Sequence, residues 1–374
     1  MTGRLGRRRP QPPIGRYTST EAEPGERGLR FGRDHSDAVG RNVTAYERLF
    51  DEIHGLGKAD LDRIGADLRA RLRAEAPELT DEIEAIAEGA GVSAARLMAV
   101  NARTEILAGA GPPECSVIGI GAACRAGGPL LAQNWDWHPD VADGLVIWTV
   151  LDPDGSWFTT LTEAGIVAKV GLNSRGVAVC LNILASSADG GVSGLPIHLL
   201  LRQVLQSCGD MESVGRLIGG HSYSASSALS VVAPTAGGEA ELRSFEVSPG
   251  RVGALADRDG ILLHTNHFLD LPAGLEDHHR RDWPDTLGRI EELEGRFLGR
   301  CGEVGEAEIK QALSSHDAGP MAICCHDADN PDFAARTQSL ASILMHPAEG
   351  RMEVADGPPC TATYREIPLP QLAA

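Results

Sequence analysis

The sequence predicts an α+β protein in which a helical N-terminal part precedes a β-rich part, and three observations lead to this class. Between about residues 40 and 110, apolar residues recur along one stripe of a helix, at Leu61, Ile64, Leu68 and Leu72. Two consecutive prolines, Pro112 and Pro113, then prevent a helix from continuing. Beyond them, short apolar runs alternate with turn residues, which is typical of antiparallel strands.

Capping and turn signals place the individual elements. Thr80 and Ser93 are expected to begin helices, because a hydroxyl side chain can accept a hydrogen bond from a backbone N–H of the first turn. Strands are expected at 117–121, 130–135, 145–151, 157–161, 166–170, 177–183, 228–233, 241–247, 261–265, 321–325, 340–345 and 352–355. Helices are expected at 197–206, 211–218, 286–298 and 306–313. Strand runs that alternate with helix pairs indicate separate α and β layers.

The composition excludes several classes of partner. The chain has 374 residues, of which 42% are hydrophobic, so it can bury a large core. Its 34 Lys and Arg against 52 Asp and Glu give a net charge of −18. No apolar run approaches the ~18–20 residues of a membrane-spanning helix. We therefore expect neither a nucleic acid nor a membrane among its partners.

The N-terminus and the cysteines indicate a cytoplasmic protein. Five arginines lie between Met1 and Arg16, but no apolar export segment follows them, so we interpret residues 1–25 as a flexible basic tail. The eight cysteines are scattered without a C-x-x-C motif, which argues against a disulfide framework. Five of them are interpreted as packing residues: Cys124, Cys180, Cys208, Cys301 and Cys360.

Three short segments carry side chains suited to catalysis. Glu114-Cys115-Ser116 places a thiol directly after the proline-rich junction. Gln133-Asn134-Trp135-Asp136-Trp137 brings an amide, a carboxylate and two indoles to the end of an expected strand. His264-Thr265-Asn266-His267-Phe268 is a polar cluster after an apolar run. Each segment alone has a simpler structural interpretation, since a lone cysteine is more often a buried packing residue than a nucleophile.

Together and in this order, the three segments resemble the acyl-coenzyme A:6-aminopenicillanic acid acyltransferase family. Two further stretches fit the resemblance, Thr162–Asn173 and Gly194–Arg202, and it covers roughly residues 40–360. Members of this family are self-processing N-terminal-nucleophile (Ntn) hydrolases. The resemblance implies a four-layer αββα sandwich, made as a precursor that cuts itself before its nucleophilic cysteine.

Carried over to this sequence, the cut falls between Glu114 and Cys115. Residues 26–114 would then form a mostly helical small chain, and residues 115–374 a large chain that contains the catalytic sandwich, with the two remaining associated. The freed α-amino group of Cys115 would have an unperturbed pKa of about 7.7–8.0. One residue would then supply both the nucleophile and its base.

The resemblance also implies roles for the other motif residues. Asn266 matches the asparagine that stabilises the oxyanion, and a side-chain amide is a neutral donor suited to that role. Asp136 matches the aspartate beside the new N-terminus, where a carboxylate would orient the ammonium group and tune its pKa. Residues assigned to positioning or to substrate binding are Asn134, Trp135, His267 and Arg336.

The function implied is cleavage or exchange of an amide- or thioester-linked acyl group through a Cys115 acyl-enzyme, in secondary metabolism. The partners expected are a small-molecule acyl donor and an amine or water acceptor. No cofactor is expected, although acyl-coenzyme A is a candidate co-substrate. Two alternatives stay open: a plain amidohydrolase that never uses coenzyme A, and a non-catalytic binding protein that retains the fold.

One further cluster contains residue types that bind metals. Cys324-Cys325-His326 lies close in sequence to His316 and Asp317. Zinc sites normally show C-x₂₋₄-C or H-x₃₋₅-H spacing, and adjacent cysteines on a strand point to opposite faces. We therefore expect no metal site.

Overall fold

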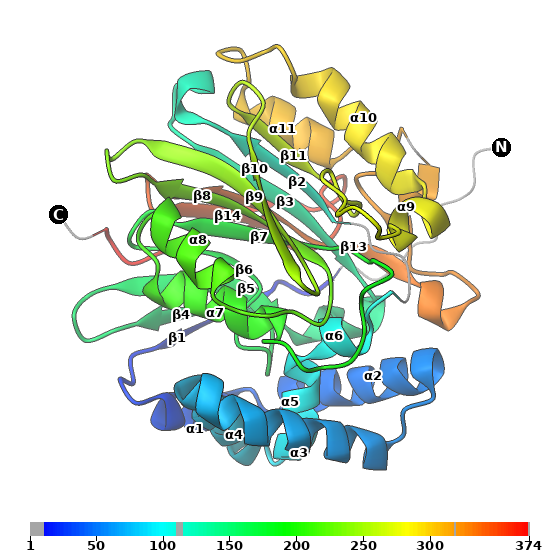
Figure 1. Cartoon of the computed structure of the whole chain (residues 1–374). Coiled ribbons are helices and arrows are strands. Elements are labelled where there is room, and N and C mark those ends of the chain that lie inside the picture. Colours follow the sequence, from blue (N-terminus) through cyan, green and yellow to red (C-terminus); the bar gives the residue numbers. More distant parts are fainter. Residues whose placement is uncertain (1–10, 110–114, 318, 373–374) are drawn as a thin grey trace.

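Two β-sheets lie face to face in the structure, a computed structural model that describes residues 11–109, 115–317 and 319–372 (Figure 1). One sheet has the order β1-β4-β5-β6-β7-β8-β9-β10. Its strands are β1 (Gly15–Ser19), β4 (Leu145–Leu151), β5 (Trp157–Glu163), β6 (Val170–Asn173), β7 (Ala178–Ile183), β8 (Ser227–Pro234), β9 (Ala240–Ser248) and β10 (Arg251–Ala256).

The second sheet has the order β11-β2-β3-β13-β14-β15, and β12 pairs with β13. Its strands are β2 (Ser116–Ile120), β3 (Leu130–Trp137), β11 (Ile261–His264), β12 (His326–Asp327), β13 (Thr337–His346), β14 (Arg351–Ala355) and β15 (Tyr364–Ile367). Neighbouring strands are antiparallel throughout this sheet.

Helices cover the outer face of each sheet and so complete four layers. Helices α7 (Ile197–Ser207) and α8 (Met211–Gly219) pack on the first sheet. On the second sheet, α10 (Asp285–Phe297) and α11 (Glu306–Leu313) pack against apolar residues of β2, β3 and β11, and the short α9 (His278–Asp282) precedes α10. The larger apolar core includes strand residues of both sheets and continues into α7, α8 and the N-terminal helices. The expected αββα layering is therefore observed.

The N-terminal helices form a separate bundle at one end of the sandwich (blue to cyan in Figure 1). They are α1 (Pro24–Asp34), α2 (Ser36–His54), α3 (Lys58–Glu75), α4 (Pro77–Ala90), α5 (Ala94–Asn101) and α6 (Arg103–Ile106). The bundle is joined to the sandwich by a buried ion pair, in which Glu82 of α4 accepts hydrogen bonds from Arg27 of α1 and Arg202 of α7. All three side chains are at most 2% exposed.

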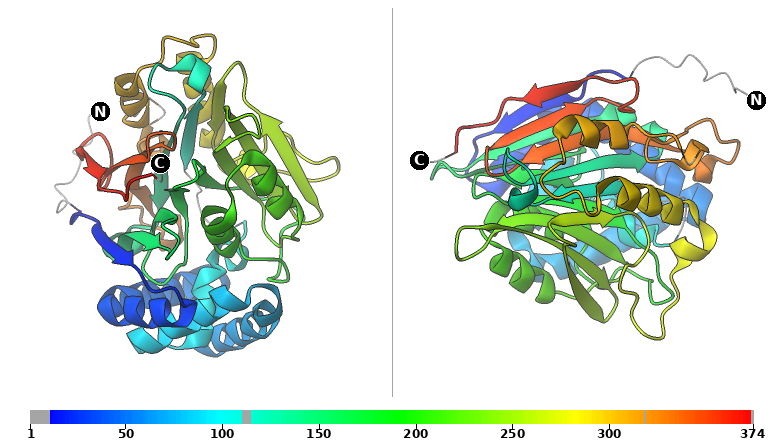
Figure 2. Two further views of the ribbon diagram at one scale, coloured as in Figure 1. Left: turned by 90° about the vertical axis from the view of Figure 1, so that its left-hand side faces the viewer. Right: turned by 90° about the horizontal axis from the view of Figure 1, so that it is seen from above.

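The prediction of a flexible tail is wrong for the part of residues 1–25 that the structure describes. Residues 15–19 form β1, which pairs in parallel with β4. Ile14 is buried, and its carbonyl oxygen accepts a hydrogen bond from Arg365 of β15 (2.9 Å). Figure 2 shows β1 (blue) and β15 (red) close together, so the N-terminal segment bridges edges of both sheets. Because this segment is polar and rich in arginine, its sequence does not predict a strand.

Three other local expectations are also wrong. Thr80 lies inside α4, where its hydroxyl donates to the Ala76 carbonyl, because Pro77 already begins that helix. Residues 166–169 lie outside the strands, since a turn after Glu163 precedes β6. Residues 321–325 are irregular and only His326–Asp327 pair with β13. In contrast, Ser93 caps α5 as expected, accepting from the Arg96 N–H.

The cysteines differ from the packing interpretation. Cys124 and Cys301 form a disulfide between segments 177 residues apart, and Cys360 is exposed. Cys180 and Cys208 are buried packing residues as expected. Because disulfides are rare in reducing compartments, the cysteines of this chain do not indicate a reducing compartment. No helix in the described residues has the length and apolarity to cross a membrane.

Candidate active site

Cys115 lies at the start of β2, where the two sheets face each other. Because Ser116 pairs with Asn134, the register brings Cys115 to the carboxyl-terminal end of β3. Its side chain is 6% exposed, and its Sγ lies 3.8 Å from the Asp136 carbonyl oxygen. The Cys115 carbonyl oxygen accepts hydrogen bonds from Asn182 Nδ2 (2.9 Å) and Arg289 Nη1 (3.0 Å). The backbone of this residue is therefore fixed from both sides.

The Cys115 thiol is protonated at neutral pH in this environment. Burial, together with the charge of Asp136, raises its pKa to about 11 against the opposing charges of Lys169 and Arg289. Ionisation of the thiol thus requires a base or a nearby cation.

Asp136 is a buried carboxyl group beside this thiol. Its side chain is 2% exposed, and among the described residues neither carboxylate oxygen has a hydrogen-bond partner of normal geometry. Burial raises the pKa of Asp136 to about 8, although the nearby Ser339 hydroxyl and the Arg289 charge lower it. A buried carboxylate without partners is costly, so the site favours the arrival of a donor or a cation here.

Asn266 follows β11 and is completely buried. Its Nδ2 donates to the Ile183 carbonyl oxygen (2.9 Å), which uses one of the two amide hydrogens. Its backbone carbonyl oxygen lies 3.0 Å from His279 Nδ1, and its backbone N–H donates to Thr286 Oγ1. The side-chain amide is therefore held rigidly, with one N–H to spare for a ligand.

Arg289 of α10 links the Cys115 segment to this amide, and sequence reasoning missed it. Its Nη1 also donates to Ser116 Oγ (3.1 Å), and both Nη atoms lie 3.2–3.3 Å from Asn266 Oδ1. The guanidinium also lies 3.3 Å from Asp285 Oδ2. A sequence signal existed, because Arg289 falls on the stripe of α10 that buries Thr286, Leu293 and Phe297.

Lys169 and Asn182 are two further site residues that the sequence analysis did not single out. Lys169 is buried, with its Nζ 3.8 Å from the Trp135 ring centre and 3.7 Å from Glu163 Oε1. Burial lowers the pKa of Lys169 to about 7, with a further contribution from Arg103. A lone lysine in a stretch of apolar residues, Ile166–Val170, was the available signal.

The residues expected to position the site or bind substrate occupy several places. Asn134 donates to the Leu313 and Ile323 carbonyl oxygens, both at 2.7 Å, and so ties the outer layer to β3. Trp135 is buried between the sheets. His267 Nδ1 lies 3.0 Å from Thr286 Oγ1, and burial lowers its pKa to about 4. Trp135 thus lies between the sheets, whereas the Asn134 side chain faces the outer helical layer and His267 packs against Thr286 of α10.

Arg336 contacts residues of the loop before β13. Its Nε donates to the Asn330 carbonyl oxygen (2.9 Å), and its guanidinium carbon is 5.4 Å from the Phe333 ring centre. Glu114, on the other side of the expected cut, lies outside the described residues.

The buried thiol of Cys115 and the buried carboxyl group of Asp136 lie close together on an αββα sandwich, and side chains of these types are suited to acyl transfer. A comparison with protein families agrees with this class. The model of the "Acyl-coenzyme A:6-aminopenicillanic acid acyl-transferase" family matches residues 124–359, more than half of the chain. The chain therefore belongs to this family, as its motifs indicate.

Among curated proteins, the chain is similar to the acyl-coenzyme A:6-aminopenicillanic-acid-acyltransferase 40 kDa form of Emericella nidulans. The two are 29% identical over 315 residues, which cover 82% of this chain and 84% of the relative. This match extends the family assignment over most of the chain.

Two solved structures show a remote likeness. A mutant of the conjugated bile acid hydrolase from Clostridium perfringens matches with a TM-score of 0.42 and 9% identity, over 68% of this chain and 97% of that one. Penicillin V acylase from Agrobacterium tumefaciens matches with a TM-score of 0.41 and 14% identity, over 68% and 86%.

Proposed function

We propose that this protein is a self-processing Ntn acyltransferase that cleaves or exchanges an acyl group through a thioester on Cys115. The observation that carries the proposal is the setting of Cys115, whose carbonyl oxygen is held by Asn182 and Arg289 while its thiol lies against Asp136. Membership of an acyltransferase family supports the reaction class.

In the proposed processing step, Cys115 Sγ attacks the carbonyl carbon of Glu114. The C–N bond to Cys115 breaks and a thioester forms, and the nitrogen takes the thiol proton. Water then hydrolyses the thioester, leaving a Glu114 carboxylate and a free Cys115 thiol and α-amine. The positive charges of Lys169 and Arg289, which lower the pKa of the thiol, favour its ionisation while the α-amine is still part of the peptide bond.

The new α-amine also provides the partner that Asp136 lacks. An ammonium group at the start of β2 would pair with this buried carboxylate, and each charge would offset the cost of burying the other. Because the two groups would then titrate together, the pair controls when the amine is free to accept a proton. Asp136 is accordingly proposed to orient and tune the base.

In turnover, the Cys115 α-amine accepts the thiol proton as the sulfur attacks the acyl carbonyl carbon. The remaining Nδ2–H of Asn266 donates to the oxyanion, and Arg289 holds that amide in place. The leaving amine or thiol departs with the proton from the ammonium group. Water or an amine then resolves the thioester, which distinguishes hydrolysis from transfer.

Producing the two chains as separate polypeptides tests whether the Cys115 α-amine is the base. Residues 115–374, beginning at Cys115, are co-produced with residues 1–114, and the pair is assayed for acyl transfer from acyl-coenzyme A and from simple amides. The pair should be active without any cutting, and one extra uncleaved residue before Cys115 should abolish that activity. Full activity with the extra residue would show that another group is the base. Hydrolysis of amides alone would identify a plain amidohydrolase.

A further inference from the structure

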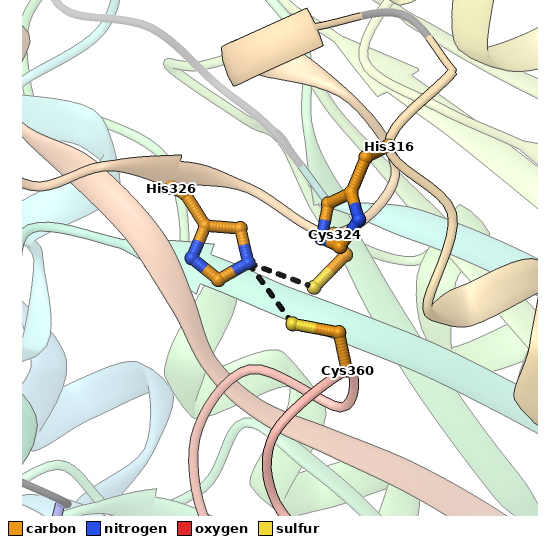
Figure 3. A group of neighbouring side chains, drawn as sticks. All are labelled: His316, Cys324, His326 and Cys360. Atoms are coloured by element: carbon orange, nitrogen blue, oxygen red, sulfur yellow. Dashed lines mark hydrogen bonds between the residues drawn. The ribbon is translucent and has the colours of Figure 1, made fainter. Parts of the chain in front are cut away.

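Four side chains of types that bind metals meet in the structure, three of them close together in the sequence and the fourth 34 residues further along. His316, Cys324, His326 and Cys360 each offer one ligand atom, and these atoms all lie within 4.8 Å of one another. Figure 3 shows His316, Cys324 and His326 converging from the segment between α11 and β13, with Cys360 approaching from the loop between β14 and β15. The sequence does not predict this cluster, because the spacing of His316, Cys324 and His326 is not that of a zinc motif and Cys360 lies far along the chain.

The distances between these ligand atoms are close to the ligand–ligand distances of a tetrahedral metal site. His326 Nε2 lies 3.3 Å from Cys324 Sγ and 3.2 Å from Cys360 Sγ. In a tetrahedral zinc site, bond lengths of about 2.3 Å to sulfur and about 2.0–2.1 Å to nitrogen place such S···N pairs about 3.6 Å apart. Small shifts of the side chains, two of which are exposed, would make room for the ion.

Hydrogen bonding alone explains the cluster poorly. A ring nitrogen carries either one hydrogen or one lone pair, so Nε2 of His326 can form a good hydrogen bond with only one of the two sulfurs. A metal ion at the centre satisfies both thiolates and both imidazoles at once. Two thiolates and two imidazoles are a ligand set typical of structural zinc.

A second group in the described residues, Glu306, His346 and Glu353, is a weaker candidate. Lys310 donates to Glu306 Oε1 (2.7 Å) and to Glu353 Oε2 (2.6 Å). Arg351 also pairs with both carboxylates. Because cations already neutralise these ligands, this group has no need of a metal ion.

We propose that His316, Cys324, His326 and Cys360 bind one zinc ion as a four-ligand structural site. Binding releases the two thiol protons and leaves the ion no open position for chemistry. The ion would fasten the β14–β15 loop to the segment before β12. That segment holds Asn134 through the Ile323 carbonyl oxygen, and the Cys325 N–H donates to Ser339 Oγ beside Asp136. The site would therefore stabilise one wall of the candidate active site.

Zinc binding to the full chain tests this proposal directly. The protein is purified under reducing conditions, freed of metal with a chelator, and titrated with zinc in competition with a chromophoric chelator. We expect one ion per chain. Cys360→Ser and His316→Ala alter exposed ligands, so both variants should fold. Each should weaken binding by at least the roughly 10–100-fold that loss of an outer-shell partner costs at other metal sites.

Two controls and a spectroscopic readout make the result specific. Cys208→Ser removes a free thiol elsewhere, and Glu353→Gln removes a ligand of the second group, so neither should change the affinity. Cobalt bound to the wild type should show thiolate charge-transfer absorption, which Cys360→Ser should reduce. Equal zinc affinity of the wild type and Cys360→Ser would overturn the proposal.

Discussion

Arg289 Nη2 lies 3.2 Å from the side-chain oxygen of Asn266, which fixes the direction in which the Asn266 amide presents its N–H groups. The same guanidinium holds the Cys115 carbonyl oxygen. One buried arginine thus sets the position of the candidate oxyanion donor relative to the candidate nucleophile. If this alignment matters for the transition state, disturbing it should affect turnover more than substrate binding.

Replacing Arg289 tests this alignment. Arg289→Lys keeps the charge but cannot reproduce the forked hydrogen bonds, so we expect a clear loss of kcat with little change in KM. Arg289→Met should also reduce the free energy of unfolding, by about 1–3 kcal/mol for each acceptor left without a donor. Steady-state kinetics and urea unfolding measure the two effects. Unchanged kcat in a folded Arg289→Met protein would rule out the positioning role.

Asn266→Ala should lower turnover by about 10²–10³-fold, because removing one oxyanion donor typically has that effect. Asn266→Asp should be at least as damaging, since it places a negative charge near the developing one. Asn173→Ala is a matched control, because Asn173 is also buried and donates to two carbonyl oxygens, those of Leu205 and Cys208. The control should lose stability and keep the turnover of the folded enzyme. An equal kinetic loss in both variants would assign Asn266 a structural role.

The raised pKa of Asp136 predicts a pH dependence of stability in the uncut chain. The folded-state pKa is about 8, above the unfolded value of about 3.9, so the folded state retains a proton that the unfolded state has lost between these values. Raising the pH from 4 to 8 therefore favours unfolding.

Urea unfolding at pH 5 and pH 8 isolates the contribution of Asp136. The background is the Cys115→Ala chain, which should remain uncut, and Asp136→Asn is added to it. The second variant should lose less stability between the two pH values than the first. Identical pH dependence in both would show that Asp136 is ionised throughout this range.

Glu82 predicts how firmly the two pieces of a cut chain would hold together. Because it is buried between Arg27 and Arg202, Glu82→Gln leaves uncompensated charges, and breaking such a buried pair typically costs about 3–5 kcal/mol. Glu212→Gln breaks the exposed pair with Arg216 and serves as the control. Size-exclusion chromatography in mild urea should separate the pieces of Glu82→Gln first. If the pieces of both variants separated at the same urea concentration, Glu82 would not be the residue that holds them together.

The sequence could predict the residues that lie in local motifs, and the structure brings those motifs together. Cys115 directly precedes an apolar strand, Asp136 lies near the end of another, and Asn266 follows a third, and the apolar pattern of each strand is visible in the chain. The alternation of strands and helix pairs likewise predicted the layered architecture. The roles of these residues in catalysis stay predictions.

The remaining features depend on contacts between distant segments, which local patterns do not carry. Arg289 reaches Cys115 from a helix 174 residues away, and Cys360 reaches His326 across 34 residues. The same holds for β1, whose polar strand is stabilised by pairing with β4 and not by its own composition. Pairing, burial and side-chain convergence of this kind follow only from the tertiary structure.

Intact-mass spectrometry of freshly produced protein tests the central claim most directly. Self-processing before Cys115 predicts two pieces of about 12 and about 27 kDa, in proportion to residues 1–114 and 115–374 of the 39.5 kDa chain. The larger piece should begin at Cys115 and gain one acyl group on that residue when an acyl donor is added. Cys115→Ala should remain whole and unmodified. A wild-type chain that stays uncut after long incubation, or a cut at any other bond, would contradict the assignment of Cys115 as an N-terminal nucleophile.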